Sequence, residues 1–342
     1  VYNYMYTRGL QTSMGNCNWN LIYDANDCWQ KPGDNTKLAR LSANDADGGN
    51  KNYSRISDIN VQKGDYLRPP LGEAARHLRA TEYLFERFAR LPVEIDIASE
   101  FRYRKPAFGK NSFAVFVSQS GETADTIAAV REIKAKGAKV LAICNVQGST
   151  LAREADGCLF LRAGAEIGVC STKAFTSQLV VLSLFTLLMA RMRHMSKIEG
   201  QQYLHALQQL PLQIQSVLEA APLIEKIAKK YSKYNDFFFL GRRYMFPTAL
   251  EGALKLKEIA YVNANGYPAG EMKHGPIALI SETCPTVALC ADKVTYDKLI
   301  SNLMEAKARH GKIIAIVHEG AEGIETVADD VIYVPDTCDE FA

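Results

Sequence analysis

The sequence contains no long hydrophobic run and no block of one charge. Its longest apolar stretch, Leu179–Ala190, falls short of the roughly 18 to 20 residues that a membrane-spanning helix requires, so a buried core helix is the better interpretation. Lys and Arg together number 40 against 38 Asp and Glu, a formal net charge of +2. Without a basic block or a basic amphipathic helix, the sequence favours neither a nucleic-acid partner nor a membrane surface.

The sequence also lacks the signs of a secreted or disulfide-bonded protein. Its 8 cysteines form no CxxC pair and no spacing typical of a disulfide framework. Several lie in apolar runs, as Cys144 does in Val140-Leu-Ala-Ile-Cys-Asn145, and act there as small hydrophobic residues. No secretory signal opens the sequence. A reducing cytoplasm fits these absences best.

What is present is enough apolar sequence for a full core. The chain has 342 residues, of which 47% are hydrophobic, and this length favours two domains. Residues 1–66 are rich in Asn, Asp, Gly and Tyr and show no helical or strand period, so they stay unassigned. The two domains are expected at 67–212 and 213–342.

Beyond about residue 78, helices and strands alternate. Helices are predicted at 77–90, from 127, at 149–155, 172–195, 197–230, 247–262 and 294–310. Strands are predicted at 93–97, 113–117, 139–145, 158–161, from 236, and at 286–290, 312–317 and 330–334. This alternation predicts an α/β fold in which a parallel sheet is covered on both faces. Two similar halves in tandem suggest a duplication, and ligands of such sheets bind beyond the carboxyl ends of the strands.

The stretch from Phe113 to Thr126 joins an apolar run of strand length to a helix. Three hydroxyl residues and a glycine lie in the intervening Ser118-Gln-Ser-Gly-Glu-Thr123. Hydroxyls and free backbone N–H groups therefore gather at a helix N-terminus, where the dipole favours an anion. The spacing matches neither GxxxxGK[ST] nor GxGxxG, and no P-loop lysine is present. The turn is typical of a phosphate pocket for a small molecule; an ordinary Ser/Thr-capped turn is the alternative.

Three charged residues on a predicted helix form a second candidate site. Glu251, Lys255 and Glu258 are spaced i, i+4, i+7 and fall within about 60° of arc. One interpretation is a surface ladder of ion pairs, and the other is a carboxylate placed for proton transfer beside a lysine. His274 lies in the Gly- and Pro-rich segment 266–276, which predicts an ordered loop. Its imidazole is either simply solvated or available for proton exchange near neutral pH.

Four segments together carry a resemblance to a known family. They are Ser118-Gln-Ser-Gly-Glu-Thr-Ala-Asp-Thr126, Ala165-Glu-Ile-Gly-Val-Cys-Ser-Thr-Lys-Ala-Phe-Thr176, Leu250-Glu-Gly-Ala-Leu-Lys-Leu-Lys-Glu258 and Gly270-Glu-Met-Lys-His-Gly-Pro276. In this order they resemble the isomerase half of the glucosamine-6-phosphate synthases, the glutamine–fructose-6-phosphate aminotransferases. The match covers roughly residues 78 to 342. It implies two tandem sugar-isomerase (SIS) domains, each a mostly parallel sheet flanked by helices in a flavodoxin-like three-layer arrangement.

The resemblance also implies a reaction and a partner. Fructose 6-phosphate would become glucosamine 6-phosphate with ammonia from a glutaminase domain, in cytoplasmic amino sugar biosynthesis leading to UDP-GlcNAc. The enzyme would be a homodimer, with His274 acting across the interface. Neither a metal nor another cofactor is expected, and no cluster of metal-ligand type is apparent in the sequence.

The roles of individual residues follow from the same resemblance. His274 would help open the sugar ring, and Glu258 would move the proton between C1 and C2, with Lys255 and Glu251 ordering the site. The substrate-binding residues would be Ser118, Gln119, Ser120 and Thr123 at the phosphate, Val169 and Ser171 at the sugar, and Gly72.

Three departures from the family limit what we expect of this chain. The family's Cys-Gly-Thr-Ser turn reads Leu71-Gly-Glu-Ala74 here, and the apolar strand before it is missing. Glu73 in place of Thr would repel a dianionic substrate by on the order of 1 kcal/mol. The C-terminal tail with the family's Schiff-base lysine and the N-terminal glutaminase domain are absent as well. We therefore expect a fragment that binds sugar phosphate but is a weak or inactive catalyst.

Two other functions share parts of this pattern. A SIS sensor or regulator of sugar phosphates needs the pocket at 118–123 but not Glu258 and His274 together. Another SIS enzyme, such as a phosphosugar isomerase or deglycase, differs mainly in substrate. The segments at 165–176 and 270–276 favour the synthase.

Overall fold

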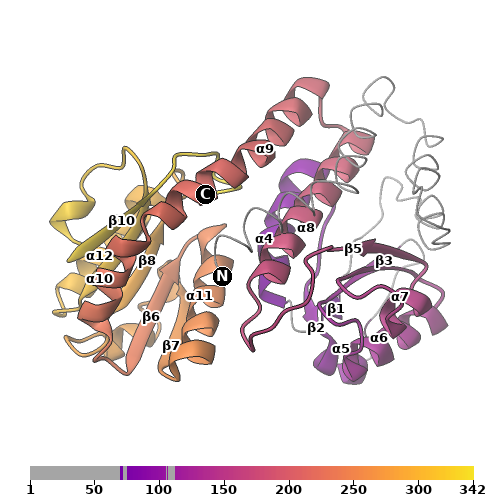
Figure 1. The fold of residues 1–342 in the computed structure, drawn as a ribbon, viewed down its shortest axis with the longest axis horizontal. Coiled ribbons are helices and arrows are strands. Elements are labelled where there is room, and N and C mark those ends of the chain that lie inside the picture. The colour runs from indigo at the N-terminus through magenta and orange to yellow at the C-terminus, as the bar shows by residue number, and fades with distance from the viewer. Residues whose placement is uncertain (1–69, 72–74, 105, 107–111) are drawn as a thin grey trace. The chain divides into compact units, whose positions relative to one another are not determined.

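The computed structural model describes residues 70–71, 75–104, 106 and 112–342 (Figure 1). The unassigned segment 1–66 lies outside this part of the chain. The chain divides into two compact units, and the division falls between Leu204 and His205. Each unit is described on its own. A boundary at residues 212 and 213 stays a prediction.

The helices and strands alternate along both units. The first unit contains β1 (Pro70–Leu71), α4 (Ala75–Leu84), the π-helix η5 (Phe85–Ala89), β2 (Asp96–Ile97), α5 (Ala98–Arg104), β3 (Phe113–Ser118), α6 (Ala124–Ala135), β4 (Lys139–Cys144), α7 (Thr150–Glu154), β5 (Gly157–Phe160) and α8 (Lys173–Arg193). Helix α9 (Lys197–Glu219) crosses the division. The second unit continues with α10 (Ala221–Tyr231), β6 (Asp236–Gly241), α11 (Met245–Ala260), β7 (Asn263–Pro268), the 3₁₀ helices η6 (Ala269–Glu271) and η7 (Pro276–Leu279), β8 (Thr286–Cys290), α12 (Tyr296–Lys307), β9 (Ile313–His318), η8 (Ile324–Thr326) and β10 (Asp330–Val334).

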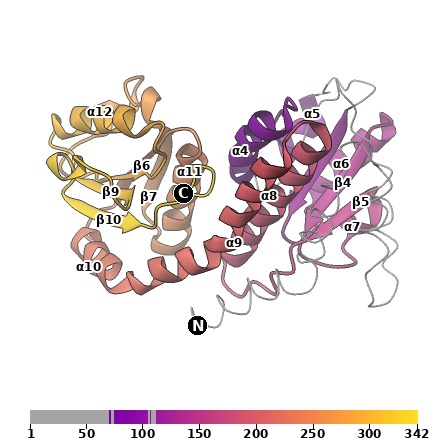
Figure 2. The same cartoon turned by 90° about the horizontal axis from the view of Figure 1, so that it is seen from above.

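The first unit is a three-layer α/β/α arrangement. Strands β3, β4 and β5 pair in parallel, β1 pairs in parallel with β2, and β1 lies next to β3. Ala114 and Phe116 of β3 pack with α5, α6 and α7 on one face. Phe113 faces the other way and meets Phe185 of α8. The period-2 alternation of a strand places successive side chains on opposite faces, so β3 holds both helical layers. Figure 2 shows α8 and α6 on opposite faces of this sheet.

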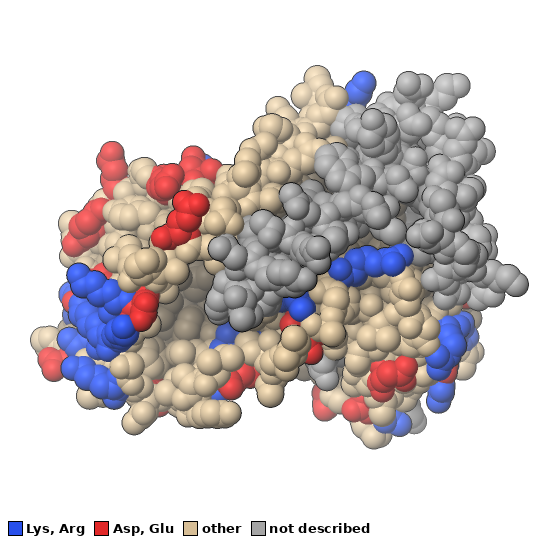
Figure 3. Space-filling view, viewed as in Figure 1, with Lys and Arg blue, Asp and Glu red and all other residues tan. Residues whose placement is uncertain are grey.

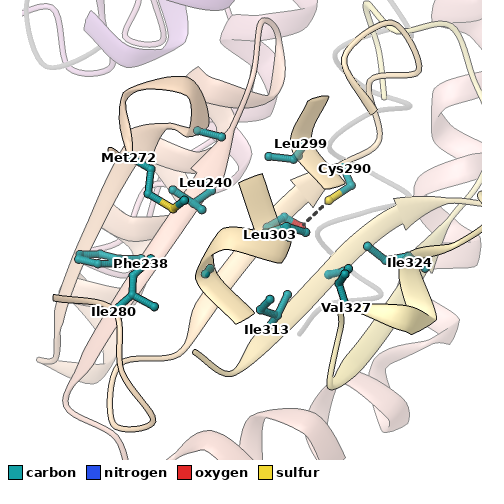
Figure 4. Close-up of a cluster of buried hydrophobic side chains, with 14 of the residues drawn as sticks. Phe238, Leu240, Met272, Ile280, Cys290, Leu299, Leu303, Ile313, Ile324 and Val327 are labelled. Atoms are coloured by element: carbon teal, nitrogen blue, oxygen red, sulfur yellow. Dashed lines mark hydrogen bonds between the residues drawn. The ribbon is translucent and has the colours of Figure 1, made fainter. Parts of the chain in front are cut away.

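The second unit has the same layers around a five-stranded parallel sheet. Its strand order, β7-β6-β8-β9-β10, is the flavodoxin-like order of doubly wound folds. Phe237 and Phe239 of β6 pack against α10 and α11. Phe238 and Leu240 face the opposite layer, where α12 contributes its apolar side chains (Figure 4). The order of the chain reverses between β6 and β8, which is where such folds bind their ligands.

A shared anchor supports the duplication of the two units. Asp156, just before β5, accepts a hydrogen bond from Val140 N at 2.9 Å and donates its own N–H to Val140 O. Asp329, just before β10, makes the same two bonds with Ile313. In the first unit the carboxylate thus ties the start of β4 to the residue before β5, and in the second unit it ties the start of β9 to the residue before β10. The parallel sheets and flanking helices confirm the predicted fold class.

Three predicted elements differ in the structure. The expected strand 93–97 is a regular strand only at Asp96–Ile97, and helix α5 begins directly after it at Ala98. A strand does precede Gly72, since Pro70–Leu71 pairs with β2, although the sequence suggested that it was missing. Residues 266–268, expected in a loop, belong to β7, which pairs with β6 along its whole length.

Helix α8 is the one described helix long and apolar enough to cross a membrane by length and composition. Within the structure, 67% of its apolar window is buried, which is typical of the core helix that the sequence predicted. All six cysteines of the described residues are free, and five of them are buried. Acidic and basic side chains are interspersed over the described part of the face in Figure 3.

Candidate functional site

The hydroxyl turn that follows β3 is folded by its own side chains. Ser118 Oγ accepts a hydrogen bond from Gly121 N at 3.1 Å, and Ser120 Oγ accepts one from Glu122 N at 3.2 Å. Such bonds from Ser to a backbone N–H two or three residues later are what make hydroxyl residues favourable in turns. The predicted residues Ser118, Gln119, Ser120 and Thr123 are therefore brought together at the carboxyl end of β3.

Gly121 is required by both conformation and space. Its φ is +67°, in the left-handed region, and a Cβ placed there would lie 2.3 Å from Ser149 Oγ. Its carbonyl accepts a hydrogen bond from Leu151 N at 3.0 Å. Ser149 in turn caps α7 by accepting from Ala152 N. The turn is thus pressed against the N-terminus of α7, a contact that the sequence did not reveal.

Glu122 places a carboxylate inside a turn predicted to hold an anion. Glu122 Oε1 accepts a hydrogen bond from Thr150 N at 2.8 Å, at the first residue of α7. Hydrogen bonds from the Thr150 backbone and side chain hold the pKa of Glu122 below its usual range. The N-terminal end of α7 stabilises this negative charge, so Glu122 serves the turn as an anchor.

No side chain of the described residues caps the N-terminus of α6. Thr123 is its N-cap residue, yet it makes no side-chain cap hydrogen bond. In the first turn of the helix, Thr126 is buried, and its Oγ1 has no hydrogen-bond partner among the described residues. Buried hydroxyls normally find a partner. An uncapped helix N-terminus beside an unsatisfied hydroxyl can accept an anion, and Thr126 was not among the predicted residues.

Asn145, at the end of β4, joins this turn to the loop that follows β5. Its N–H donates to Gln119 O at 3.1 Å. Its side chain accepts from Ala163 N at 2.9 Å and donates to Gly164 O at 2.6 Å. The same loop carries Val169 and Ser171, so the predicted phosphate and sugar residues lie on loops that one side chain ties together. The sequence carried one signal for this role, an Asn directly after an apolar run of strand length.

The two predicted sugar residues differ in exposure. Val169 is 94% exposed, and Ser171 is partly buried, with its Oγ donating to Glu166 Oε1 at 3.3 Å. An apolar side chain held in water by an ordered loop is available for contact with a ligand.

The charged residues of α11 form one connected cluster in the second unit. Lys255 Nζ lies 3.2 Å from Glu251 Oε1 and 2.9 Å from Glu258 Oε2. The Glu251 side chain is only 6% exposed, so the interpretation as a surface ladder does not hold for it. Glu258 remains 27% exposed and can reach a ligand. A buried glutamate thus holds a lysine that orients a second, accessible glutamate.

His274 lies apart from this cluster in its interactions. Its side chain is 75% exposed, and its ion-pair partner is Glu271, at 3.9 Å, rather than a carboxylate of α11. Its N–H donates to Glu271 O in the turn that follows η6. The structure therefore presents His274 to solvent on the second unit. Gly72 and Glu73 lie outside the described residues.

Comparison with known proteins shows the family of this chain. The SIS domain family model matches residues 79–188 and 230–338. The solved C-terminal domain of glucosamine–fructose-6-phosphate aminotransferase from Francisella tularensis is similar with a TM-score of 0.79 and 34% identity, over 94% of this chain and 90% of that domain. The chain belongs to the SIS domain family, in the group of the glutamine–fructose-6-phosphate aminotransferases. The resemblance inferred from the four motifs is thereby confirmed.

Curated relatives show how much of a longer protein this SIS chain represents. It is 51% identical over 256 residues to the aminotransferase of Thermus thermophilus, covering 75% of this chain and 42% of the relative. The Chlorobaculum tepidum relative is 50% identical over 254 residues, with 74% and 41% covered. The chain thus spans less than half the length of these relatives. More distant SIS structures, such as tagatose-6-phosphate ketose/aldose isomerase from Escherichia coli (TM-score 0.66, 14% identity, 96% and 89% covered), share the fold.

The two SIS domains differ at the turn that precedes their equivalent helices α6 and α12. In the first domain the turn holds Ser118, Ser120 and Thr123. The equivalent turn of the second domain, 291–295, follows β8 and contains Asp292, which is 1% exposed and lies 3.3 Å from Arg243 Nη1. Asp292 is paired with Arg243, so this turn holds a buried ion pair where the first domain has a turn of hydroxyl side chains. Only the first SIS domain therefore carries the chemistry of an anion site at this position. Among the described residues, no group of three His, Cys, Asp or Glu could hold a metal ion.

Proposed function

We propose that the chain is the isomerase part of a glutamine–fructose-6-phosphate aminotransferase. It binds fructose 6-phosphate and converts it to glucosamine 6-phosphate, with ammonia supplied by a glutaminase domain of the full-length enzyme. The observation that carries this proposal is the uncapped N-terminus of α6 beneath a turn of hydroxyl side chains. The relatives whose names contain this reaction share half of their residues with the chain over the matched region.

The phosphate is recognised by neutral donors. Ser118, Gln119, Ser120 and Thr123 supply hydroxyl and amide groups around the α6 N-terminus, and Thr126 adds a buried hydroxyl that lacks a partner. Several hydrogen bonds to the dianion hold the sugar phosphate without a lysine, since each is stronger than a hydrogen bond between two neutral groups. Val169 and Ser171 contact the sugar from the neighbouring loop.

The proton transfer belongs to α11. Ammonia first condenses with the C2 carbonyl of the open-chain sugar, which releases water and leaves an imine. Glu258 then removes a proton from C1 and returns it to C2, because a carboxylate can both take and give one proton. Lys255, held by the buried Glu251, orients Glu258. The proposed phosphate residues belong to the first SIS domain, and Glu258 belongs to the second.

His274 assists the opening of the sugar ring, and we place it at the active site of the partner in a homodimer. Its exposure supports this assignment, because the side chain is free to meet a second subunit. Imidazole suits the step, since it exchanges protons near neutral pH. The enzyme works in the cytoplasm, in amino sugar biosynthesis leading to UDP-GlcNAc.

Binding is tested by isothermal titration of the chain with fructose 6-phosphate and with fructose, which lacks the phosphate. We expect measurable binding of the phosphate ester alone. Ser120→Ala weakens it about tenfold, the effect of one lost hydrogen bond to a charged group. Ser281→Ala is the matched control, because Ser281 Oγ also accepts from the N–H two residues later, at Thr283. Equal binding of fructose and its phosphate would contradict the proposal.

The chemical step is tested with Glu258→Gln. In the full-length enzyme, we expect the dissociation constant for fructose 6-phosphate to stay within about twofold, while glucosamine 6-phosphate formation from ammonium drops at least about 100-fold. Glu225→Gln is the control, since Glu225 also pairs with a lysine one helical turn away, at Lys229. Retained turnover in Glu258→Gln would favour another base, and lost binding would favour a role in the phosphate site.

A further inference from the structure

One side chain gathers the start of α8 and the loop before it. Glu166 Oε1 accepts hydrogen bonds from Ala174 N at 2.8 Å, from Thr172 N at 3.2 Å and from Ser171 Oγ at 3.3 Å. Thr172, the N-cap residue of α8, makes no side-chain cap bond of its own. Glu166 therefore caps the helix from six residues upstream, and the positive end of the helix dipole stabilises its charge.

This cap closes the loop 167–170 at both ends. Before Glu166, the loop is fixed by Asn145, which bonds to Ala163 N and Gly164 O. After residue 170, Ser171 and the first turn of α8 are fixed by the Glu166 carboxylate. The loop between these anchors presents Ile167 and Val169, which are almost fully exposed. An apolar loop ordered before its ligand arrives loses less conformational entropy on binding.

We propose that Glu166 is a positioning residue for the sugar phosphate. It holds the loop with Val169 and Ser171 in its binding conformation, and it occupies the N–H groups with which α8 would otherwise attract an anion. Glu122, in the same SIS domain, accepts from a backbone N–H at the start of α7. Of the helices α6, α7 and α8, α6 therefore has the N-terminus that is left for the phosphate. This inference rests on the proposed function, because it concerns the binding of that substrate.

Glu166 acts through the position of its oxygen rather than by touching the sugar. A glutamine retains that oxygen as an acceptor, whereas an aspartate retains the charge but is too short to reach Ala174 N and Ser171 Oγ together. The two variants therefore separate reach from charge. Glu166→Gln is expected to bind fructose 6-phosphate within about threefold of the unsubstituted chain, and Glu166→Ala and Glu166→Asp about tenfold more weakly.

A purely structural cap is distinguished by Glu199. Its carboxylate accepts from Ser196 N at 2.8 Å at the start of α9, so Glu199→Ala also removes a glutamate that stabilises a helix N-terminus. Both alanine variants are expected to lower the midpoint of urea unfolding by similar amounts. Only Glu166→Ala weakens the binding of fructose 6-phosphate and speeds amide hydrogen exchange in residues 166–174.

The titrations with fructose 6-phosphate decide between the outcomes. If the unsubstituted chain does not bind, the proposed function fails. If it binds and Glu166→Ala binds equally well, the inference fails while the function stands. The inference also fails if Glu166→Asp binds as the unsubstituted chain does and Glu166→Gln does not, because the charge of the side chain, and not the position of its oxygen, would then control binding.

Discussion

At the scale of single residues, the turn at Ser118–Thr123, proposed to hold the phosphate, depends on partners outside it. Gly121 meets Ser149, Gln119 meets Asn145, and Glu122 meets Thr150. Each partner lies at the carboxyl end of β4 or at the start of α7. The spacing within the turn predicted its hydroxyls, but it carries no information on these neighbours.

Gly121→Ala tests the fit of the turn. The new Cβ clashes with Ser149, and the alanine must also adopt a left-handed φ. We therefore expect the free energy of unfolding to fall by about 2 to 4 kcal/mol. Gly137→Ala is the control, because Gly137 also has a positive φ, of +82°, but no heavy atom of the described residues lies within 4 Å of the Cβ position. Gly137→Ala should lower the free energy of unfolding by only about 1 kcal/mol. Urea denaturation measures both, and equal losses would show that the contact with Ser149 is unimportant.

Burial decided the meaning of the charged residues on α11. The spacing of Glu251, Lys255 and Glu258 predicted one stripe, which equally suited a surface ladder. Which residue of a stripe faces the sheet depends on the packing of α11 against β6 and β7, where Gly252 lets Phe239 come close. The sequence could place the three residues together but could not tell that Glu251 is buried.

At the scale of elements, strands with an apolar pattern were predicted well and β7 was not. Residues Asn263-Ala-Asn-Gly-Tyr-Pro268 have little strand propensity. They form a strand because β6 offers a free edge and because Gly266 allows the backbone of α11 to approach. Tertiary pairing, not local preference, makes this element.

The anchor between β9 and β10 predicts a dependence on pH. Burial by itself would raise the pKa of Asp329, but hydrogen bonds from Lys307 and from Ile313 N–H outweigh it and leave the pKa below its ordinary value. Because the folded state prefers the ionised form, its stabilisation is complete above the unfolded pKa, near about 4. It is lost as the pH falls through the lower folded value.

Asp329→Asn should therefore lower the free energy of unfolding by about 1 to 3 kcal/mol at pH 7 and by less at pH 3. Urea denaturation between these pH values measures the difference. Glu325→Gln serves as the control, since Glu325 is an exposed carboxylate that bonds to Tyr333 at the surface. A loss in Asp329→Asn that does not change with pH would contradict the role given to its charge.

At the scale of the whole molecule, the two domains differ at one equivalent turn, which holds the proposed anion site in the first and a salt bridge in the second. Arg243 Nη1 lies 3.3 Å from Asp292 and 3.2 Å from Asp339. The Asp339 carboxylate also accepts from Lys293 N, so this cluster fastens the segment near residue 339 to the turn that follows β8. The position that holds the proposed phosphate site in one half thus holds a structural cluster in the other.

This difference predicts one sugar phosphate per chain. Isothermal titration with fructose 6-phosphate should give a stoichiometry of about one rather than two, because the second turn is occupied by the ion pair of Asp292 and Arg243. Ser120→Ala should weaken that single event, and Ser301→Ala, a hydroxyl change on α12, should leave it unchanged. Two equal binding events would contradict the assignment.

The sequence by itself determined the family, the α/β class, most of the regular elements and the polar residues with the proposed roles. It could do so because hydrophobic period and short motifs are local properties of a chain. Only the tertiary structure decided that Glu251 is buried, that β7 is a strand, and that Asn145, Glu122 and Glu166 tie loops together. The hydrogen bonds of Asn145 and Glu122 join segments far apart in sequence, and the Glu251 burial and β7 pairing depend on packing against other elements. The Glu166 cap depends on the path of its loop, and none of these is set by local pattern.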